Sequence, residues 1–201
     1  MDDSLKQKFG YGEMYEWENP QELNKDFRLG RFVTFSKKDP LKIVPVNKAD
    51  QQIIGITTVN SVVDSDNPNE WAFKNLCDIY GDIYLRKEKL AVGEKVYDQL
   101  NEMNYIRTRP WEHYIPITNP QYNKDAQYVK RSNRIEWVNV NLMGKAIVVD
   151  NGKCEPGKYC MPYTGKVKAL YGSAVPATDN AKHKYYVLAR LSEKTILVFN
   201  K

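Results

Sequence analysis

Short apolar runs separated by turn-forming residues recur along both ends of the chain. The runs are rich in Val, Ile, Thr, Phe and Tyr, which fit the half-buried surface of a pleated sheet. No segment repeats apolar residues at helical spacing for more than about two turns. The pattern therefore predicts strands at residues 31–35, 41–44, 53–57, 61–63, 145–149, 185–188 and 195–199.

Three polar segments predict how some of these strands begin or end. Residues 150–152 (DNG) follow the strand predicted at 145–149 and carry the Asn-Gly pair typical of tight hairpins. Residues 192–194 (SEK) predict a second hairpin between the last two strands. The Asn-Pro pair at residues 67–68 predicts one short helical turn, because proline suits the first helical position.

The middle of the chain, residues 64–135, differs from both ends. It is rich in Asn, Asp, Tyr, Pro and charge, and it predicts strands only at residues 82–85 and 95–97. Tyrosine and tryptophan are favoured at interfaces, because the ring buries area while its polar edge stays satisfied. We therefore expect extended arms that pack against neighbouring subunits, although core tyrosines are an alternative. The aromatic residues concerned are Tyr80, Tyr84, Tyr97, Tyr105, Trp111, Tyr114, Tyr122 and Tyr128.

Residues 9–17 (FGYGEMYEW) combine glycines, carboxylates and aromatic side chains in one short segment. Gly10 and Gly12 stand directly before Glu13 and Glu16. Since glycine permits backbone geometries closed to other residues, a strained turn beside acidic groups is one interpretation. Such a site suits chemistry on the chain's own backbone. The alternative is an N-terminal strand whose packing residues are Tyr11, Met14 and Trp17.

Composition narrows the classes of function. The 201 residues fit one large domain or two small ones, and the net charge of +5 comes from interspersed basic and acidic residues. The compact basic clusters at residues 130–131 and 182–184 are typical of a solvated face, so no nucleic-acid partner is expected. No apolar run approaches the ~20 residues of a membrane span. The acidic, polar N-terminus is not a secretory signal.

The cysteines and histidines do not form a metal-binding pattern. Five residues separate Cys154 from Cys160, Cys77 is remote, and the only histidines are His113 and His183. We expect Cys154 and Cys160 to be small apolar residues on neighbouring strands, and no metal. The reduced cytosolic compartment is the default expectation.

Several ordered segments together resemble a known family. Residues 13–17 (EMYEW) resemble the entry motif of the self-cleaving intramolecular-chaperone domain found at the C-terminus of phage tail-spike and neck-appendage proteins. The similarity covers most of residues 9–201 and is weakest at 72–118. The further matching segments are residues 30–34, 53–56, 119–122, 131–137, 142–145, 148–154, 159–160 and 186–190.

The resemblance implies a disposable folding aid. Shafts rich in β structure pair residues that are distant in sequence or on different chains, so they fold slowly and risk misassembly. A C-terminal domain that trimerises first makes later pairing intramolecular, at an effective concentration of order millimolar. Self-cleavage then releases the domain and traps the shaft kinetically. The implied partners are a homotrimer of the chain and its own upstream shaft, in the host cytoplasm during phage assembly or transiently on the virion tail.

The family is grouped with glutamic peptidases, so the resemblance implies that Glu13 or Glu16 transfers protons. General acid–base help of this kind contributes roughly 10²–10⁴-fold to a rate. Relatives often carry an aspartate just before this motif, whereas this chain has Gly10 followed by Tyr11. These two residues are expected near the cleaved bond. No cofactor is evident; the resemblance allows nucleotide binding at an unknown site.

A second placement of the chemistry uses the first residues of the chain. Residues 1–6 resemble the Ser-Asp-x-x-Leu-Lys element of another self-cleaving phage chaperone class, with Met1 where the serine nucleophile should stand. Ser4 is then an alternative nucleophile, and the bond between Asp3 and Ser4 an alternative cleavage site. Lys6 would be the base, which requires its pKa to fall by about three units. A linker remnant at residues 1–8 is the remaining alternative.

The expected fold is mainly β: an antiparallel sandwich or partial barrel with extended, partly irregular arms, assembled as a trimer. Residues 1–8 would be a linker or cleavage-proximal segment, and residues 9–201 the chaperone domain with inter-subunit arms at 64–135. The alternative function is an uncleaved structural or receptor-binding tail-tip domain. A conventional hydrolase is not indicated, because Gly-x-Ser-x-Gly, His-Glu-x-x-His and phosphate-loop motifs are missing from the sequence.

Overall fold

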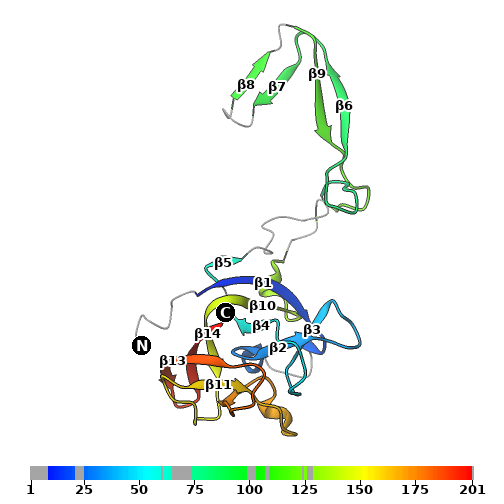
Figure 1. The fold of residues 1–201 in the computed structure, drawn as a ribbon. Helices are drawn as coiled ribbons and strands as arrows, with labels where there is room; N and C mark the ends of the chain where they lie inside the picture. Colours follow the sequence, from blue (N-terminus) through cyan, green and yellow to red (C-terminus); the bar gives the residue numbers. More distant parts are fainter. Residues whose placement is uncertain are drawn as a thin grey trace. The chain divides into compact units, whose positions relative to one another are not determined.

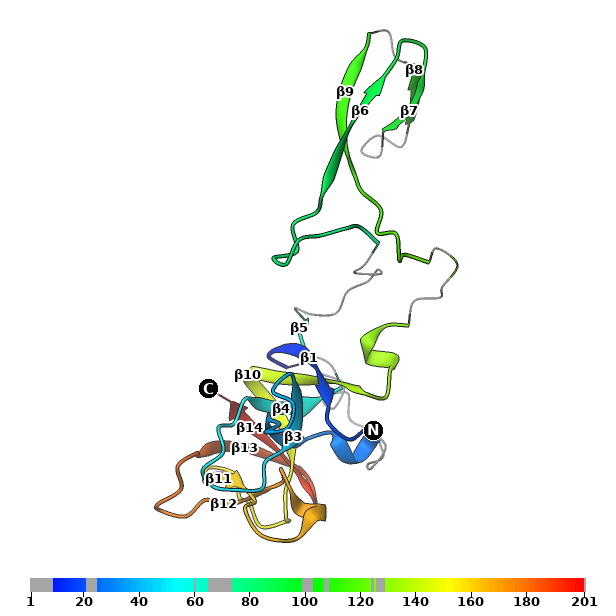
Figure 2. The same cartoon turned by 90° about the vertical axis from the view of Figure 1, so that its right-hand side faces the viewer.

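The computed structural model describes two compact units. The described residues are 9–20, 25–59, 61–64, 74–98, 103–106, 109–123, 125 and 129–200. The larger unit joins both ends of the chain, Met1–Pro68 and Val129–Lys201, and the smaller unit is Asn69–Tyr128. The strands predicted at the two ends of the chain therefore belong to one unit, which Figures 1 and 2 show from two sides.

The larger unit consists of strands and short 3-10 turns. Its strands confirm that the fold is mainly β, and all seven strands predicted at the two ends of the chain overlap strands of the structure. In order, the elements are β1 (Tyr11–Trp17), η3 (Lys25–Arg28), β2 (Phe32–Phe35), β3 (Lys42–Pro45), β4 (Gly55–Thr58), β5 (Val63–Asp64), η4 (Arg131–Asn133), β10 (Trp137–Val149), β11 (Tyr159–Pro162), η5 (Lys168–Leu170), β12 (Ala174–Pro176), β13 (Tyr185–Ser192) and β14 (Thr195–Asn200).

Five strands close into a small ring. The order β10-β4-β2-β3-β1 returns to β10, because β1 pairs with β10 as well as with β3. The ring corresponds to the partial barrel among the predicted architectures. However, β1 runs parallel to β3 and β5, so the sheet is mixed and the prediction of an antiparallel one is corrected. The long strand β10 leaves the ring and pairs over its second half with β14.

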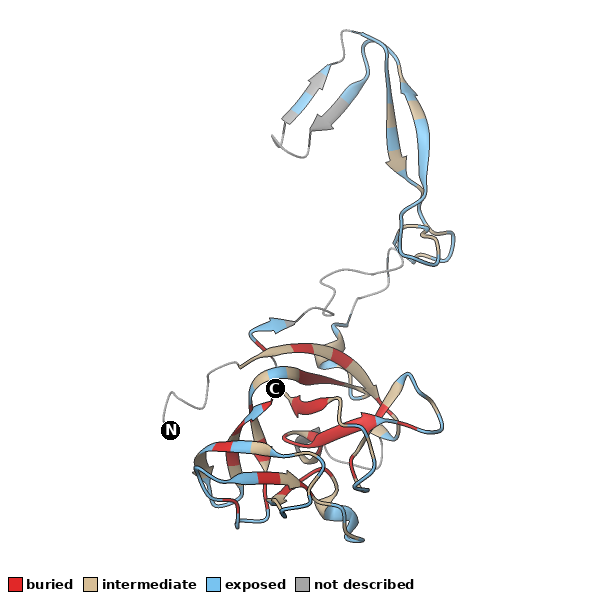
Figure 3. Ribbon diagram, viewed as in Figure 1, coloured by how far each residue is buried: buried red, intermediate tan, exposed pale blue. Residues whose placement is uncertain are grey.

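The ring separates two apolar clusters, whose buried residues are coloured in Figure 3. Successive strand residues point to opposite faces, so Val33 and Phe32 contribute to different clusters. The cluster built from ring strands contains Trp17, Val33, Ile43, Val138 and Val140. The cluster between the ring and the strands β11–β14 contains Phe32, Val46, Ile56, Ala146, Val148, Cys154, Cys160, Ala174, Val187, Ile196 and Val198.

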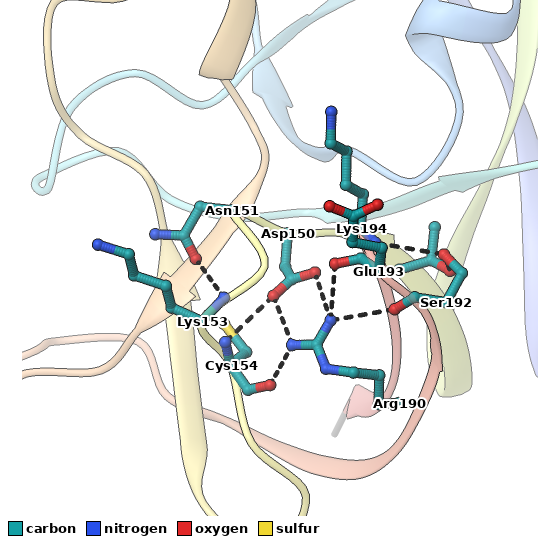
Figure 4. Close-up of polar contacts among 9 residues, drawn as sticks. Asp150, Asn151, Lys153, Cys154, Arg190, Ser192, Glu193 and Lys194 are labelled. Carbon is teal, nitrogen blue, oxygen red and sulfur yellow. Dashed lines mark hydrogen bonds and ion pairs between the residues drawn. The ribbon is translucent and has the colours of Figure 1, made fainter.

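The turn after β10 is not the predicted hairpin. Strand β10 pairs with β14, and β11 pairs with β12 and β13. The reason is a polar network, drawn in Figure 4, that includes the carboxylate of Asp150. This carboxylate has no exposed surface and pairs with Arg190 instead of capping a tight turn. Arg190 Nη2 lies 2.9 Å from Asp150 Oδ2, and the Cys154 amide donates to the same oxygen at 3.1 Å.

Arg190 connects this network to the end of β13. Its Nη1 donates to the carbonyls of Ser192 and Glu193 at 3.1 and 3.0 Å, and its Nη2 donates to the Cys154 carbonyl. Strands β13 and β14 pair antiparallel up to Ser192 opposite Thr195, which confirms the hairpin predicted at residues 192–194.

All three cysteines are free thiols; Cys154 and Cys160 are buried, as expected, whereas Cys77 is only half-buried. Only Cys160 lies on a strand; Cys154 follows the turn after β10, so its predicted strand position is wrong. Among the described residues, no group of three His, Cys, Asp or Glu could hold a metal, and no helix is long and apolar enough to span a bilayer. The helical turn predicted at residues 67–68 lies outside the described residues.

The smaller unit is a long hairpin. Strand β6 (Leu85–Leu90) pairs with β9 (Trp111–Pro116), and β7 (Lys95–Asp98) pairs with β8 (Met103–Ile106). Four residues lie between β6 and β7, and four lie between β8 and β9. The pairing of β7 with β8 therefore continues the register of β6 with β9. The strand predicted at 95–97 is confirmed, whereas that at 82–85 begins only at residue 85. Two large side chains that precede β6 in the chain are almost fully exposed, Ile79 at 90% and Tyr80 at 85%.

We expect the larger unit to lose stability at alkaline pH, because it buries the protonated thiol of Cys160 and the protonated phenol of Tyr185. A hydrogen bond with Cys154 and burial raise the pKa of Cys160, and burial raises that of Tyr185 to about 12. The unfolded chain loses these protons near pH ~8.5 and ~10. The free energy of unfolding should therefore fall as pH rises through this range, with the contribution of Tyr185 lost between about pH 10 and 12.

Denaturant unfolding measured across this pH range tests the expectation. Tyr185→Phe keeps the ring that packs 4.6 Å from Phe32 and should flatten the upper part of the pH dependence. Tyr159→Phe removes the hydroxyl of an exposed tyrosine and serves as the control. An unchanged slope in Tyr185→Phe would contradict the assignment.

Candidate functional site

The carboxylate of Glu13 is held between two phenols on β1. Tyr11 and Tyr15 donate from their hydroxyl groups to Oε1 and Oε2 of Glu13, each at 3.0 Å. The three side chains share a face because they stand two residues apart on a strand. On β10, Val140 lies opposite Glu13 and Val138 opposite Tyr15. Both valines belong to the ring cluster, so the half-buried carboxylate lies beside apolar groups.

Glu16 has a different environment. It lies three residues from Glu13, so the strand turns it to the opposite face. Lys42 Nζ lies 2.7 Å from Glu16 Oε1, and this contact raises the pKa of Lys42. The structure therefore does not bring the two carboxylates together. Glu13 keeps its oxygens for hydroxyl donors, whereas Glu16 is part of an ion pair.

The backbone before Glu13 packs closely against β10. Gly10 has a φ of +70°, which lies in the left-handed region that favours glycine. A Cβ atom there would lie 2.3 Å from both Asn141 Nδ2 and the Met143 carbonyl oxygen. The Val62 amide donates to the Gly10 carbonyl at 3.0 Å. An aspartate at position 10, which the family resemblance led us to expect, would not fit.

A buried polar group lies beneath this segment. Asn141 Nδ2 donates to the Phe9 and Lys145 carbonyls at 3.0 and 2.9 Å, so it holds the backbone where β1 begins. Ser61 donates to Asn139 Oδ1 at 2.8 Å, directly below Gly12. Sequence reasoning missed this group. The signal in the sequence was the presence of Asn139 and Asn141 two positions apart within β10, because strands disfavour asparagine.

Three further predicted site residues, Asp3, Ser4 and Lys6, lie outside the described residues. Tyr11, predicted to lie near the cleaved bond, is a hydrogen-bond donor to Glu13. The described part of the candidate site is therefore Glu13 with the phenols of Tyr11 and Tyr15. It lies next to the backbone of Gly10, which packs closely against β10.

Substituting Gly10 by alanine should destabilise the larger unit by about 2–5 kcal/mol, combining left-handed backbone strain with overpacking. Denaturant unfolding of the purified chain measures the loss. Gly157→Ala is the matched control, because φ is +81° there and the nearest atom to a new Cβ is 3.9 Å away. It should cost only about 1–2 kcal/mol, the backbone strain alone. Equal losses would show that the contacts around Gly10 carry no weight.

Two solved structures have a similar fold, and both are of bacteriophage phi29 gene product 12. The pre-mature protein has 19% identity and a TM-score of 0.58, covering 97% of this chain and 22% of that chain. The C-terminal fragment has 20% identity and a TM-score of 0.57, covering 95% of this chain and 99% of that one. The chain thus spans about a fifth of the length of the pre-mature protein.

No curated protein matches the sequence significantly. The family model for Peptidase_G2, described as the IMC autoproteolytic cleavage domain, matches residues 3–185. This match covers most of the chain and confirms the resemblance drawn from the ordered motifs. The chain therefore belongs to the Peptidase_G2 family of autoproteolytic intramolecular-chaperone domains.

Proposed function

We propose that this chain is a trimerising C-terminal chaperone that cuts itself from a β-rich shaft once the shaft has folded, with Glu13 as the proton-transfer residue. The observation that carries the assignment of Glu13 is its carboxylate, fixed by two phenols at the first described strand. The fragment released from a precursor is its C-terminal piece. The reacting groups are therefore expected near the start of the domain, where Glu13 lies.

A carboxylate in this position can take a proton from a water or hydroxyl that attacks the scissile carbonyl. It then returns the proton to the leaving amine, so no net charge accumulates. The phenols of Tyr11 and Tyr15 restrict the carboxylate to one orientation, which favours a productive geometry. Glu16 is a weaker candidate because Lys42 neutralises it. Ser4 as nucleophile and Lys6 as base stay an alternative, with cleavage between Asp3 and Ser4.

The smaller unit supports the proposed role of residues 64–135 as inter-subunit arms. A two-stranded hairpin is marginally stable alone in water. This one leaves Ile79, Tyr80 and Tyr114 exposed at 90%, 85% and 65%. A second copy of the chain or the upstream shaft would cover such side chains. In this proposal the domain acts in the host cytoplasm during phage assembly and leaves the tail afterwards.

The test expresses the chain with its natural upstream segment and follows the products by mass spectrometry. A single new N-terminus before residue 9, together with a trimer in sedimentation analysis, is the expected result. A monomer at micromolar concentration would contradict the trimer. A cut within residues 3–4 that requires Ser4 and Lys6, and is unaffected by Glu13→Gln, would favour the serine–lysine alternative.

The competing function is an uncleaved structural or receptor-binding tip. It predicts that the full-length precursor persists in assembled particles. The exposed hairpin is compatible with this function too, because a binding tip also presents apolar and aromatic side chains. Retention of the intact chain in purified particles would therefore overturn the chaperone proposal, whereas loss of residues 9–201 from them supports it.

A further inference from the structure

We infer that the larger unit contains a binding site for a small organic anion, with an apolar body and a carboxylate or sulfonate group. The site is a cavity of about 260 Å³. It lies between the loop after β3, the end of β11 and the residues that precede β13. Its lining includes Lys182 and His183 of the basic cluster at residues 182–184, for which self-cleavage provides no role.

The floor of the cavity is apolar. Val46 is 1% exposed, and Ile53, Met161 and Pro162 complete the floor. These residues come from both sides of the fold, since Val46 follows a ring strand and Met161 lies on β11. A concave apolar surface with few convergent polar groups is the usual form of a small-molecule site. The volume suits a ligand of one ring or one branched chain.

The charges around the cavity favour an anion. Lys48 and Lys182 line it, and none of the described residues in its lining is Asp or Glu. Charge-assisted hydrogen bonds from an ammonium to a carboxylate or sulfonate are roughly twice as strong as neutral ones. The third cation nearby is already engaged, because Lys184 Nζ donates to the Asp179 carbonyl at 2.8 Å.

Hydrogen bonds within the protein hold both walls of the cavity in place. Gln51 Oε1 accepts hydrogen bonds from the amides of Asn47 and Lys48, both at 2.8 Å, and so fixes the loop after β3. On the other side, the Ala181 amide donates to the Thr178 carbonyl at 3.1 Å. A preformed site loses little entropy when its ligand binds. The ligand would connect the two sides and stabilise the larger unit.

Benzenesulfonate is the probe for this site, since it has one ring and one anionic group. Titration followed by amide NMR should shift Lys48, Ala181 and His183 together and raise the melting temperature with ligand concentration. Three matched compounds separate the contributions: neutral benzenesulfonamide, inorganic sulfate without the ring, and cationic benzylammonium. We expect each to bind at least about tenfold more weakly, in line with the loss of one charge-assisted contact or of the apolar burial.

Variants test the residues. Lys48→Gln and Lys182→Gln should each weaken benzenesulfonate binding by about tenfold, because each removes one ammonium group from the cavity lining. Lys184→Gln removes the same charge from the adjacent cluster position and should leave the affinity unchanged. Equal binding of all four compounds, equal effects of Lys182→Gln and Lys184→Gln, or shifts away from the cavity would overturn the inference. Self-cleavage is measured separately and is not expected to depend on these positions.

Discussion

Replacing Glu13 by glutamine in the precursor is expected to slow self-cleavage by about 10²–10⁴-fold, the usual contribution of a general acid–base group. The amide keeps the size of the side chain and can still accept from one phenol, but it cannot take up a proton. The rate is measured as the decline of full-length precursor after refolding. The melting temperature of the variant should change little, because the side chain is half-buried on the strand surface.

Glu16→Gln is the matched control for this prediction. It makes the same chemical change three residues away but removes only a surface ion pair with Lys42, which solvent screens. Its cleavage rate should stay near that of the parent chain. The same loss of rate in both variants, or in Glu16→Gln alone, would sink the assignment of Glu13.

The hydroxyl groups of Tyr11 and Tyr15 allow a finer test of the same site. Tyr→Phe at either position removes one orienting hydrogen bond and keeps the ring, so we expect a loss on the order of 10-fold in rate. Both single variants should leave the cleaved bond unchanged. A double variant that cleaves at the parental rate would show that Glu13 needs no fixed orientation.

The sequence identified the acidic segment but not its geometry. Residues three apart share a face of a helix and take opposite faces of a strand. Once residues 11–17 are a strand, Glu13 must therefore separate from Glu16. Likewise, the sequence comparison suggested that Gly10 replaces an aspartate. The structure explains why this position is a glycine, because its φ is left-handed and a Cβ atom there would collide with Asn141. These contacts join residues more than 100 positions apart, and local patterns carry no information about them.

For the fold as well, the sequence predicted the positions of the strands but not how they pair. Apolar runs located the strands at both ends of the chain, because side-chain alternation is a local property. Closure of the ring depends on β1 pairing with β10 and β3, and only tertiary packing decides that choice. The turn after β10 was misread for a related reason. Asp150 has the sequence position of a hairpin residue, but a distant partner, Arg190, determines its conformation.

Asp150→Ala should therefore destabilise the larger unit by about 3–5 kcal/mol, the range for removing one partner of a buried ion pair. The carboxylate has no exposed surface, whereas the Arg190 side chain is 27% exposed. Its removal leaves the guanidinium without a counter-ion and the Cys154 amide without its acceptor. Denaturant unfolding measures the change. Asp150→Asn keeps the shape and one acceptor, so it should cost less than alanine but more than a surface substitution.

Glu155→Ala is the control that separates burial from charge. It removes a carboxylate five residues away that pairs with Lys158 at 2.6 Å, and both side chains there are more than 60% exposed. Such a pair contributes little to stability, because water and salt screen it. Similar losses in Asp150→Ala and Glu155→Ala would mean that the network does not hold the turn against the β13–β14 hairpin. A large loss confined to Asp150 would assign that role to the buried carboxylate, since both variants delete one negative charge from the same loop.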